Sequence, residues 1–173
     1  MHRRRILTLT TAALLGLGVT LPSGDASGQG LITKDQLVGT WAYVSVVVQR
    51  ADGTKVETFG PNPQGRIIFT ADGRYALLLV RPDLPKIASK DRLTGTAEEN
   101  NAVAKGVLAH FGTYSVNAAD SSFTLHVEAS SFANDNGTDQ KRMVTSFTGD
   151  ELKWTNPTPT TPFIAYAVLR RVK

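Results

Sequence analysis

Leu37-Val38-Gly39-Thr40-Trp41 opens the stretch of sequence that decides the fold. It is followed by Phe59-Gly60-Pro61-Asn62-Pro63-Gln64-Gly65 and then by Phe69-Thr70-Ala71-Asp72-Gly73-Arg74-Tyr75. Pro-Asn-Pro and Asp-Gly are turn sequences, and the segments around them are rich in aromatic and β-branched residues. The order is therefore strand, turn, strand, Asp-Gly turn, strand, which predicts consecutive antiparallel hairpins.

Similar runs continue to the end of the chain, with turn residues between them. The predicted strands are 37–49, 55–59, 66–70, 74–81, 113–116, 123–129, 141–148, 151–155 and 163–171. Short connections favour pairing between consecutive strands, and closure removes the exposed edges that so many strands would otherwise leave. The sequence therefore predicts an all-β protein, a closed antiparallel β-barrel of about eight to nine strands.

One segment breaks this pattern and predicts a helix between the fourth and fifth strands. Thr96-Ala97-Glu98-Glu99 fits a capping box, and residues 97–109 are rich in helix formers. The helix follows the irregular stretch 82–93, where Pro82 and Pro85 prevent regular pairing. Loop and helix together would either cap one mouth of the barrel or pack on its outer wall.

Residues 1–28 predict a cleaved export signal. Arg3-Arg4-Arg5 precedes the apolar run 6–21, and small residues follow from Gly24 to Gly28. The run is short for a bilayer span, so cleavage is favoured over anchoring and no stable membrane insertion is expected afterwards. The arginines also suit a twin-arginine signal, which leaves both the Sec and the Tat route open. Residues 29–173 would then form one exported domain, periplasmic or secreted.

Charge and cysteine content exclude several classes of function. The chain has 19 Lys and Arg against 15 Asp and Glu; without the leader 16 and 14 remain, a charge of about +2. Such a balance gives no reason to expect a nucleic-acid partner. The absence of cysteine excludes disulfides, thiolate metal sites and a cysteine nucleophile. About 145 residues is the normal size of one domain with its own core, and a monomer is expected.

The Gly-x-Trp of Gly39 to Trp41, followed by hairpins, resembles the entry to a lipocalin-type barrel. The chain as a whole is most similar to the bacterial lipocalin-like domain family. Further blocks that carry the resemblance are Phe111-Gly112-Thr113-Tyr114-Ser115-Val116, His126-Val127-Glu128-Ala129-Ser130-Ser131-Phe132 with Gly137-Thr138-Asp139-Gln140-Lys141-Arg142, and Leu169-Arg170-Arg171. Two departures from classical lipocalins, a missing Asp beside Thr113-Tyr114 and a helix in mid-chain, limit what transfers to the fold and a general binding role.

The resemblance also implies a structural role for two residues. In lipocalins the signature Trp plugs one end of the barrel and is covered by an Arg of the final strand, which here corresponds to Trp41 with Arg170 or Arg171. A guanidinium over the indole face would close the barrel floor.

Tyr75, Leu77, Leu79 and Arg81 share one face of a predicted strand. An apolar wall with a phenol and a guanidinium suits an amphipathic ligand that carries a carboxylate or enolate. The alternative for Arg81 is a surface arginine whose stem lies along apolar neighbours. Tyr114 is a further candidate for ligand binding, with plain packing as its alternative.

His126, Glu128 and Arg142 are the candidates for chemistry. His126 and Glu128 are two apart on one strand, and could form a base and its orienting carboxylate, while Arg142 could stabilise developing negative charge. The alternative is simple alternation: the apolar residues Phe123, Leu125, Val127 and Ala129 lie on the opposite face, which would send His126 and Glu128 to solvent.

The sequence therefore favours an exported protein that holds a small, largely apolar or amphipathic molecule in the barrel. The alternatives are a cofactor-independent lyase, isomerase or cyclase in the same lumen, or a barrel filled by its own side chains. No cofactor is expected, because no phosphate loop, dinucleotide fingerprint or Gly-x-Ser-x-Gly is present. No metal is expected either, since the two histidines that remain without the leader, His110 and His126, make a poor zinc site in the absence of thiolates. Ligand identity and catalysis stay open.

Overall fold

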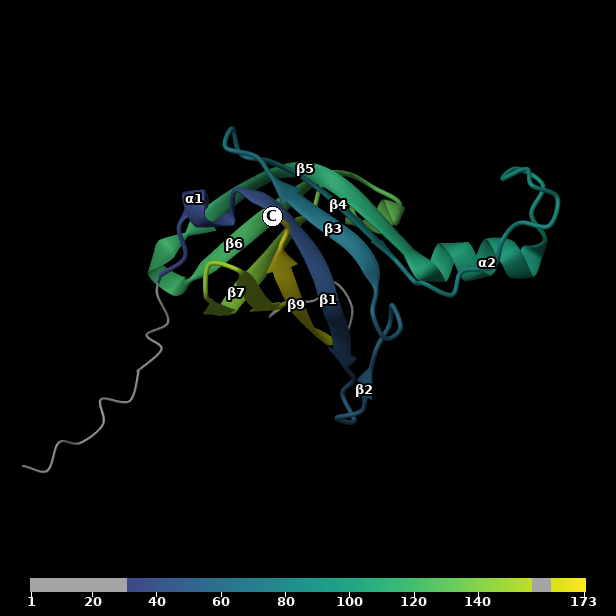
Figure 1. Cartoon of the computed structure of the whole chain (residues 1–173), viewed down its shortest axis with the longest axis horizontal. Coiled ribbons are helices and arrows are strands. Elements are labelled where there is room, and N and C mark those ends of the chain that lie inside the picture. The colour runs from purple at the N-terminus through teal and green to yellow at the C-terminus, as the bar shows by residue number, and fades with distance from the viewer. Residues whose placement is uncertain (1–30, 157–162) are drawn as a thin grey trace, which may run out of the picture.

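The computed structural model describes residues 31–156 and 163–173, and their strands close into one antiparallel barrel (Figure 1). The barrel strands are β1 (Gly39–Gln49), β3 (Gln64–Phe69), β4 (Arg74–Val80), β5 (Val107–Asn117), β6 (Ser122–Ser130), β7 (Asp139–Phe147), β8 (Glu151–Thr155) and β9 (Ile164–Arg171). From β3 onward each strand pairs with the next, and β9 returns to pair with β1. The short β2 (Lys55–Val56) is an extra strand beside the far end of β1. The predicted closed antiparallel barrel is confirmed, with eight strands and one addition.

Alternation along each strand sorts side chains between the inside and the outside of the barrel. On β4, Tyr75, Leu77 and Leu79 are buried, whereas Leu78 between them is half exposed. The apolar residues that face inward form one continuous core. Because β9 pairs with β1, the strands around this core leave no open sheet edge between them.

One end of the barrel is closed around Trp41. The single helical turn α1 (Lys34–Leu37) lies across this end, and its Leu37 carbonyl accepts a hydrogen bond from Trp41 Nε1 at 2.8 Å. The guanidinium carbon of Arg171 lies 4.1 Å from the centroid of the fully buried indole. Arg171 also donates to the carbonyls of Gln36, Val38 and Gly149. One side chain thus joins α1, β1 and the turn before β8.

This floor decides between Arg170 and Arg171, which the resemblance left open. The arginine that covers Trp41 is Arg171, which stands directly opposite Trp41 in the pairing of β1 with β9. Arg170 is exposed on the other face of β9, because neighbouring residues of a strand point to opposite sides. The helical turn α1 was not predicted; residue 37 belongs to it and not to the first strand.

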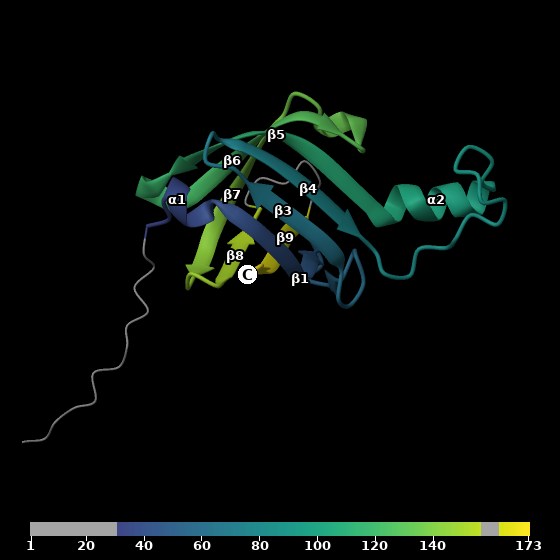
Figure 2. The ribbon, with the colours of Figure 1, turned by 45° about the horizontal axis from the view of Figure 1, so that its top comes forward.

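The mid-chain helix is α2 (Ala97–Gly106), and its predicted capping box is confirmed. Thr96 accepts from the Glu99 N–H at 3.2 Å, and Glu99 accepts from the Thr96 N–H at 2.8 Å. The predicted end at residue 109 was wrong, because 107–109 already pair with β4. Its predicted place between the fourth and fifth strands is confirmed, but its predicted packing against the barrel was wrong: α2 points away from the barrel, at the end opposite α1 (Figures 1 and 2). Only its last residues, Ala104 and Lys105, reach the open mouth.

The predicted export signal, residues 1–28, lies outside the described residues. Within 31–156 and 163–173, none of the helices has the length and apolar character needed to cross a membrane.

A matched pair of arginine variants tests the floor. We expect Arg171→Met to lower the free energy of unfolding by about 2 kcal/mol, because three backbone carbonyls lose a charged donor and the indole loses its cation. Arg170→Met should change it by less than about 0.5 kcal/mol, as for an ordinary surface position. Urea denaturation followed by Trp fluorescence measures both, and equal effects would remove Arg171 from the floor.

Candidate ligand-binding site

The open half of the barrel contains a cavity of about 440 Å³. The closed half is filled by aromatic rings, where Phe69 packs edge-on against Tyr114 and Phe123. The apolar part of the cavity lining includes Val46, Leu77, Leu79, Leu108, Trp154 and Ala167. A volume of this size and a largely apolar wall are typical of small-molecule pockets, for which roughly 300–1,000 Å³ is usual.

Arg142 brings a positive charge into this cavity. It lies on β7 between the inward residues Gln140 and Val144, and the accessible part of its side chain faces the cavity. Its Nη2 donates to Gln140 Oε1 at 2.7 Å, and its Nη1 donates to the Lys141 carbonyl at 3.1 Å. No Asp or Glu in the described part of the chain forms an ion pair with it.

Burial lowers the pKa of Arg142, and the neighbouring Tyr43, Tyr75 and Asp135 partly oppose that shift. An arginine nevertheless stays protonated at neutral pH. The cavity therefore holds a permanent cation that is hydrogen-bonded but lacks a counter-charge in contact. Such a group costs free energy until an anion joins it.

A buried Tyr75–His110 pair stands near this cation. The Tyr75 hydroxyl and His110 Nδ1 are 2.9 Å apart, and the side chain of His110 lines the cavity. Burial, helped by the charge of Arg142, lowers the pKa of His110 to about 4. Burial also raises the pKa of Tyr75 and of Tyr43. At neutral pH all three groups are uncharged and can donate or accept hydrogen bonds.

Two acceptors complete the polar part of the cavity. Asp135, at the end of the short turn η2 (Ala133–Asp135), is 6% exposed and lines the cavity. Asn156 Oδ1 is buried in the lining and receives no hydrogen bond from any described residue. A polar atom of this kind costs free energy unless something donates to it. The cavity thus offers a ligand Arg142 in its interior, Lys105 at its mouth and these two acceptors.

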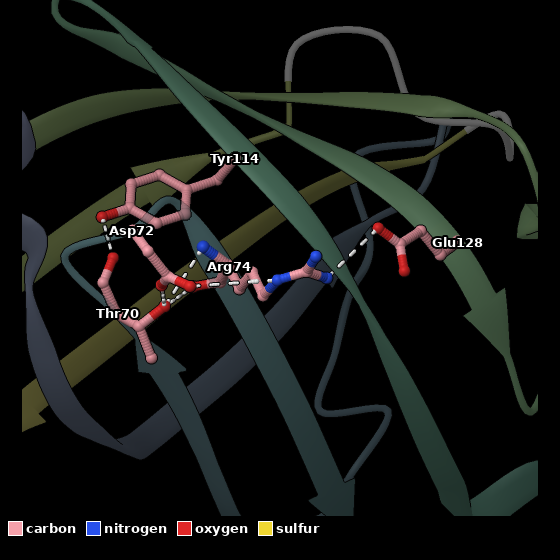
Figure 3. Close-up of polar contacts among 5 residues, drawn as sticks. All are labelled: Thr70, Asp72, Arg74, Tyr114 and Glu128. Atoms are coloured by element: carbon pink, nitrogen blue, oxygen red, sulfur yellow. Dashed lines mark hydrogen bonds and ion pairs between the residues drawn. The ribbon is translucent and has the colours of Figure 1, made fainter.

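Five of the residues predicted for ligand binding lie inside the barrel. Leu77, Leu79 and Arg142 line the cavity, and Tyr75 is bonded to the cavity residue His110. Tyr114 is also buried, but in the closed half, where its hydroxyl donates to the Thr70 carbonyl at 2.9 Å (Figure 3). Tyr114 therefore has the packing role that was the alternative to ligand binding.

Arg81 does not join this group. It follows the last residue of β4, and its guanidinium forms two hydrogen bonds with Asp83 at 2.9 and 2.7 Å. It is absent from the cavity lining. The prediction failed because it extended the inward face of the strand one residue past the end of the ladder at Val80.

His126 and Glu128 lie on the outer wall and are not near Arg142. His126 contacts Ser115 and Asp139, while Glu128 pairs loosely with Arg74 at 3.8 Å (Figure 3). The inward positions of β6 are taken by Phe123, Leu125 and Val127, all buried. The expected three-residue site is therefore wrong, and simple alternation decides the matter.

His110 is the residue that reasoning from the sequence missed. The predicted helix through 109 covered the start of β5 and hid the inward series Leu108, His110, Gly112 and Tyr114. Alternation back from Tyr114 could have found it. Tyr43, two residues after Trp41, could have been found in the same way. Asp135 comes from a turn, where no periodicity exists.

The pH dependence of stability tests the buried state of His110. Its pKa of about 4 lies below the ordinary 6.5, so only the unfolded chain binds the proton between these values. The stability contribution is therefore complete above pH 6.5 and is lost as the pH falls toward 4, by roughly 3 kcal/mol. We expect His110→Gln to lose this part of the pH dependence. An NMR titration that places His110 near 6.5 would contradict the burial argument.

The comparisons with known proteins concern the fold. Sixteen chains of solved structures match. A redesigned β-barrel shares 13% identity, with a TM-score of 0.44, and covers 86% of this chain and 100% of its own. A redesigned β-barrel bound to DFHBI shares 16% sequence identity, with a TM-score of 0.39, and the match covers 80% of this chain and 97% of that barrel. The amine-binding protein of Rhodnius prolixus, in its tryptamine complex, shares 16% sequence identity, with a TM-score of 0.40. The match covers 82% of this chain and 67% of that protein.

These likenesses are too distant to say what the cavity binds, and no protein of curated function matches the sequence. The family model described as a lipocalin-like domain matches residues 38–165, from the turn before β1 into β9. It therefore spans all but the last part of the closed barrel, and the chain belongs to the lipocalin-like domain family.

Proposed function

We propose that this protein is exported and binds a small amphipathic molecule with an acidic group in the barrel lumen. The observation that carries the proposal is Arg142, a cation without an ion pair in a largely apolar cavity of about 440 Å³. A carboxylate or enolate on the ligand would supply the missing negative charge and accept hydrogen bonds from the guanidinium. The apolar walls would cover the rest of the molecule.

The neighbours of Arg142 suit such a ligand. Tyr43, Tyr75 and His110 are neutral at pH 7, so they do not repel an anion and can donate to it. Asp135 would repel an acidic group placed close to it, which confines that group to the side of Arg142. Donor groups elsewhere on the ligand could meet Asp135 and Asn156.

A second candidate function is catalysis by a cofactor-independent lyase, isomerase or cyclase in the same cavity. The Tyr75–His110 hydrogen bond favours it, since these groups could pass a proton while Arg142 stabilises an oxyanion. These roles replace those expected of His126 and Glu128. With a pKa of about 4, however, His110 is a weak base at neutral pH, so binding is the stronger proposal.

Export is proposed from the sequence alone. Arg3-Arg4-Arg5, the apolar run 6–21 and the small residues after it have the order of an export signal. Binding in a lumen does not require export, so the two parts of the proposal can fail separately.

Displacement of an apolar fluorescent probe tests the lumen and Arg142. We expect micromolar binding of the probe, and displacement by a long-chain or polycyclic carboxylate more strongly than by its methyl ester. Arg142→Met should weaken the carboxylate at least about tenfold, or 1.4 kcal/mol, and leave the ester unchanged. Leu79→Ala should weaken both, because it removes apolar contact area.

Arg81→Met is the matched control, since it removes an arginine near the mouth that does not line the cavity. It should leave both affinities unchanged. Arg142→Met should also keep the free energy of unfolding within about 1 kcal/mol or raise it, because an unpaired buried charge is removed. An Arg142→Met protein that folds and binds both ligands equally well as the parent would refute an anion site. Mass spectrometry of the bound ligand after incubation separates binding from catalysis.

Export predicts a defined mature terminus. The full-length chain produced in a bacterial host should appear outside the cytoplasm, with an N-terminus between Ser27 and Gly30. Edman sequencing or intact mass measures it. Replacement of Arg3, Arg4 and Arg5 by Ala should reduce the exported fraction. A cytoplasmic chain that keeps residues 1–28 would argue against export.

A further inference from the structure

The outer wall of the barrel carries a row of polar residues on four neighbouring strands. The pairing places Arg74 of β4 opposite Thr113 of β5, Thr113 opposite His126 of β6, and His126 opposite Asp139 of β7. Ser115 is the next outward residue of β5 after Thr113, and it is exposed. These residues come from separate hairpins and meet only because the strands pair side by side in the wall.

Three of these side chains form a continuous hydrogen-bonded chain. His126 Nδ1 lies 2.6 Å from Asp139 Oδ1, and His126 Nε2 lies 3.1 Å from Ser115 Oγ. An ionised carboxylate can only accept, so Nδ1 carries the proton toward Asp139 and neutral Nε2 can accept from the Ser115 hydroxyl. The order hydroxyl, imidazole and carboxylate is that of an activated serine nucleophile.

An apolar hollow lies beside the polar row. Two residues along the strands, Ala76, Phe111 and Ala129 stand opposite one another on the same outer face. Together with Ala109 they line a hollow of about 320 Å³, and the Phe111 ring is 51% exposed. Phe111 lies four residues from Ser115 on β5, roughly 13 Å between their Cα atoms, so an extended acyl chain of about eight carbons reaches from Ser115 to the near side of the hollow.

We propose that this outer wall is a second reactive site, at which Ser115 takes an acyl group from esters that carry an apolar acyl chain. The acyl chain lies in the hollow over Phe111, and its carbonyl carbon faces Ser115. The reacting residues Ser115 and His126 do not line the cavity around Arg142, because they lie on the opposite face of the wall. The proposed binding function and this activity therefore use different reacting residues, although Leu77 and His110 contribute to the lining of both the cavity and the hollow.

The chemical step uses only groups on this wall. Ser115 Oγ attacks the carbonyl carbon while its proton passes to His126 Nε2. The tetrahedral oxyanion faces the Arg74 guanidinium, which the loose contacts with Asp72 at 3.9 Å and Glu128 at 3.8 Å leave free to turn. His126 then protonates the leaving alcohol oxygen as the carbon–oxygen bond breaks. The acyl group stays on Ser115 until water repeats the sequence in reverse and releases the acid.

Asp139 is a positioning residue in this scheme. It holds the His126 ring and fixes which nitrogen faces Ser115. The N–H groups of paired strands are used in the ladder, so Arg74 takes the part that backbone donors play in dedicated hydrolases. Activated esters, whose leaving groups need little help, are therefore the substrates on which the activity is measured.

The test compares p-nitrophenyl octanoate with p-nitrophenyl acetate on the mature full domain. We expect a burst of nitrophenol, an octanoyl adduct on Ser115 by intact mass and peptide mapping, and faster reaction of the octanoate. Ser115→Ala and His126→Gln should each slow acylation at least about tenfold. Thr124→Ala, which removes the hydroxyl of the partly buried residue opposite Ser115, should leave it unchanged.

Further variants test the hollow and the positioning carboxylate, with an exposed arginine of β9 as the control. Phe111→Ala should reduce the preference for octanoate and leave the acetate rate unchanged. Asp139→Asn should slow acylation and Asp139→Glu should restore part of it, which a merely structural role would not give. Arg170→Met should react normally. An adduct that persists in Ser115→Ala protein, an adduct mapped to His126 itself, or no adduct on the parent protein would each overturn the proposal.

Discussion

The pairing of β1 with β9 is the constraint on which the rest of the structure depends. It turns a meander of hairpins into a closed wall with an inside and an outside. The same pairing sets Arg171 opposite Trp41, so the residues that meet when the wall closes also seal one end. The pairing that closes the barrel wall therefore also closes the end around Trp41, while the opposite end stays open.

The interior divides into a stable half and a half that is open to a ligand. Aromatic rings in edge contacts fill the space above Trp41. In the other half the chain accepts an unpaired guanidinium and a buried acceptor without a donor. Natural proteins keep such costs where binding uses them, and here they all face the same cavity.

The sequence predicted the barrel because hairpin signals and alternation are local properties. Tyr75, Leu77 and Leu79 were placed correctly for this reason. The boundary between α2 and β5 could not be predicted, because residues 107–109 have the same apolar character in either element and only pairing with β4 decides between them. That boundary in turn hid His110. The missing partner of Arg142 was also beyond the sequence, since it depends on which carboxylates the closed wall brings within reach, and Glu128 falls outside.

The ends of the described chain have a practical meaning for anyone who wishes to use this barrel. The Val172 N–H donates to the Thr40 carbonyl, so the C-terminal residues leave the wall beside α1, at the sealed end. Helix α2, whose Lys105 lines the cavity, lies at the end opposite α1 (Figure 2). A reporter protein or a surface tether attached after Lys173 would therefore point away from the entrance. The molecule could be immobilised as an oriented sensor whose opening faces the solution.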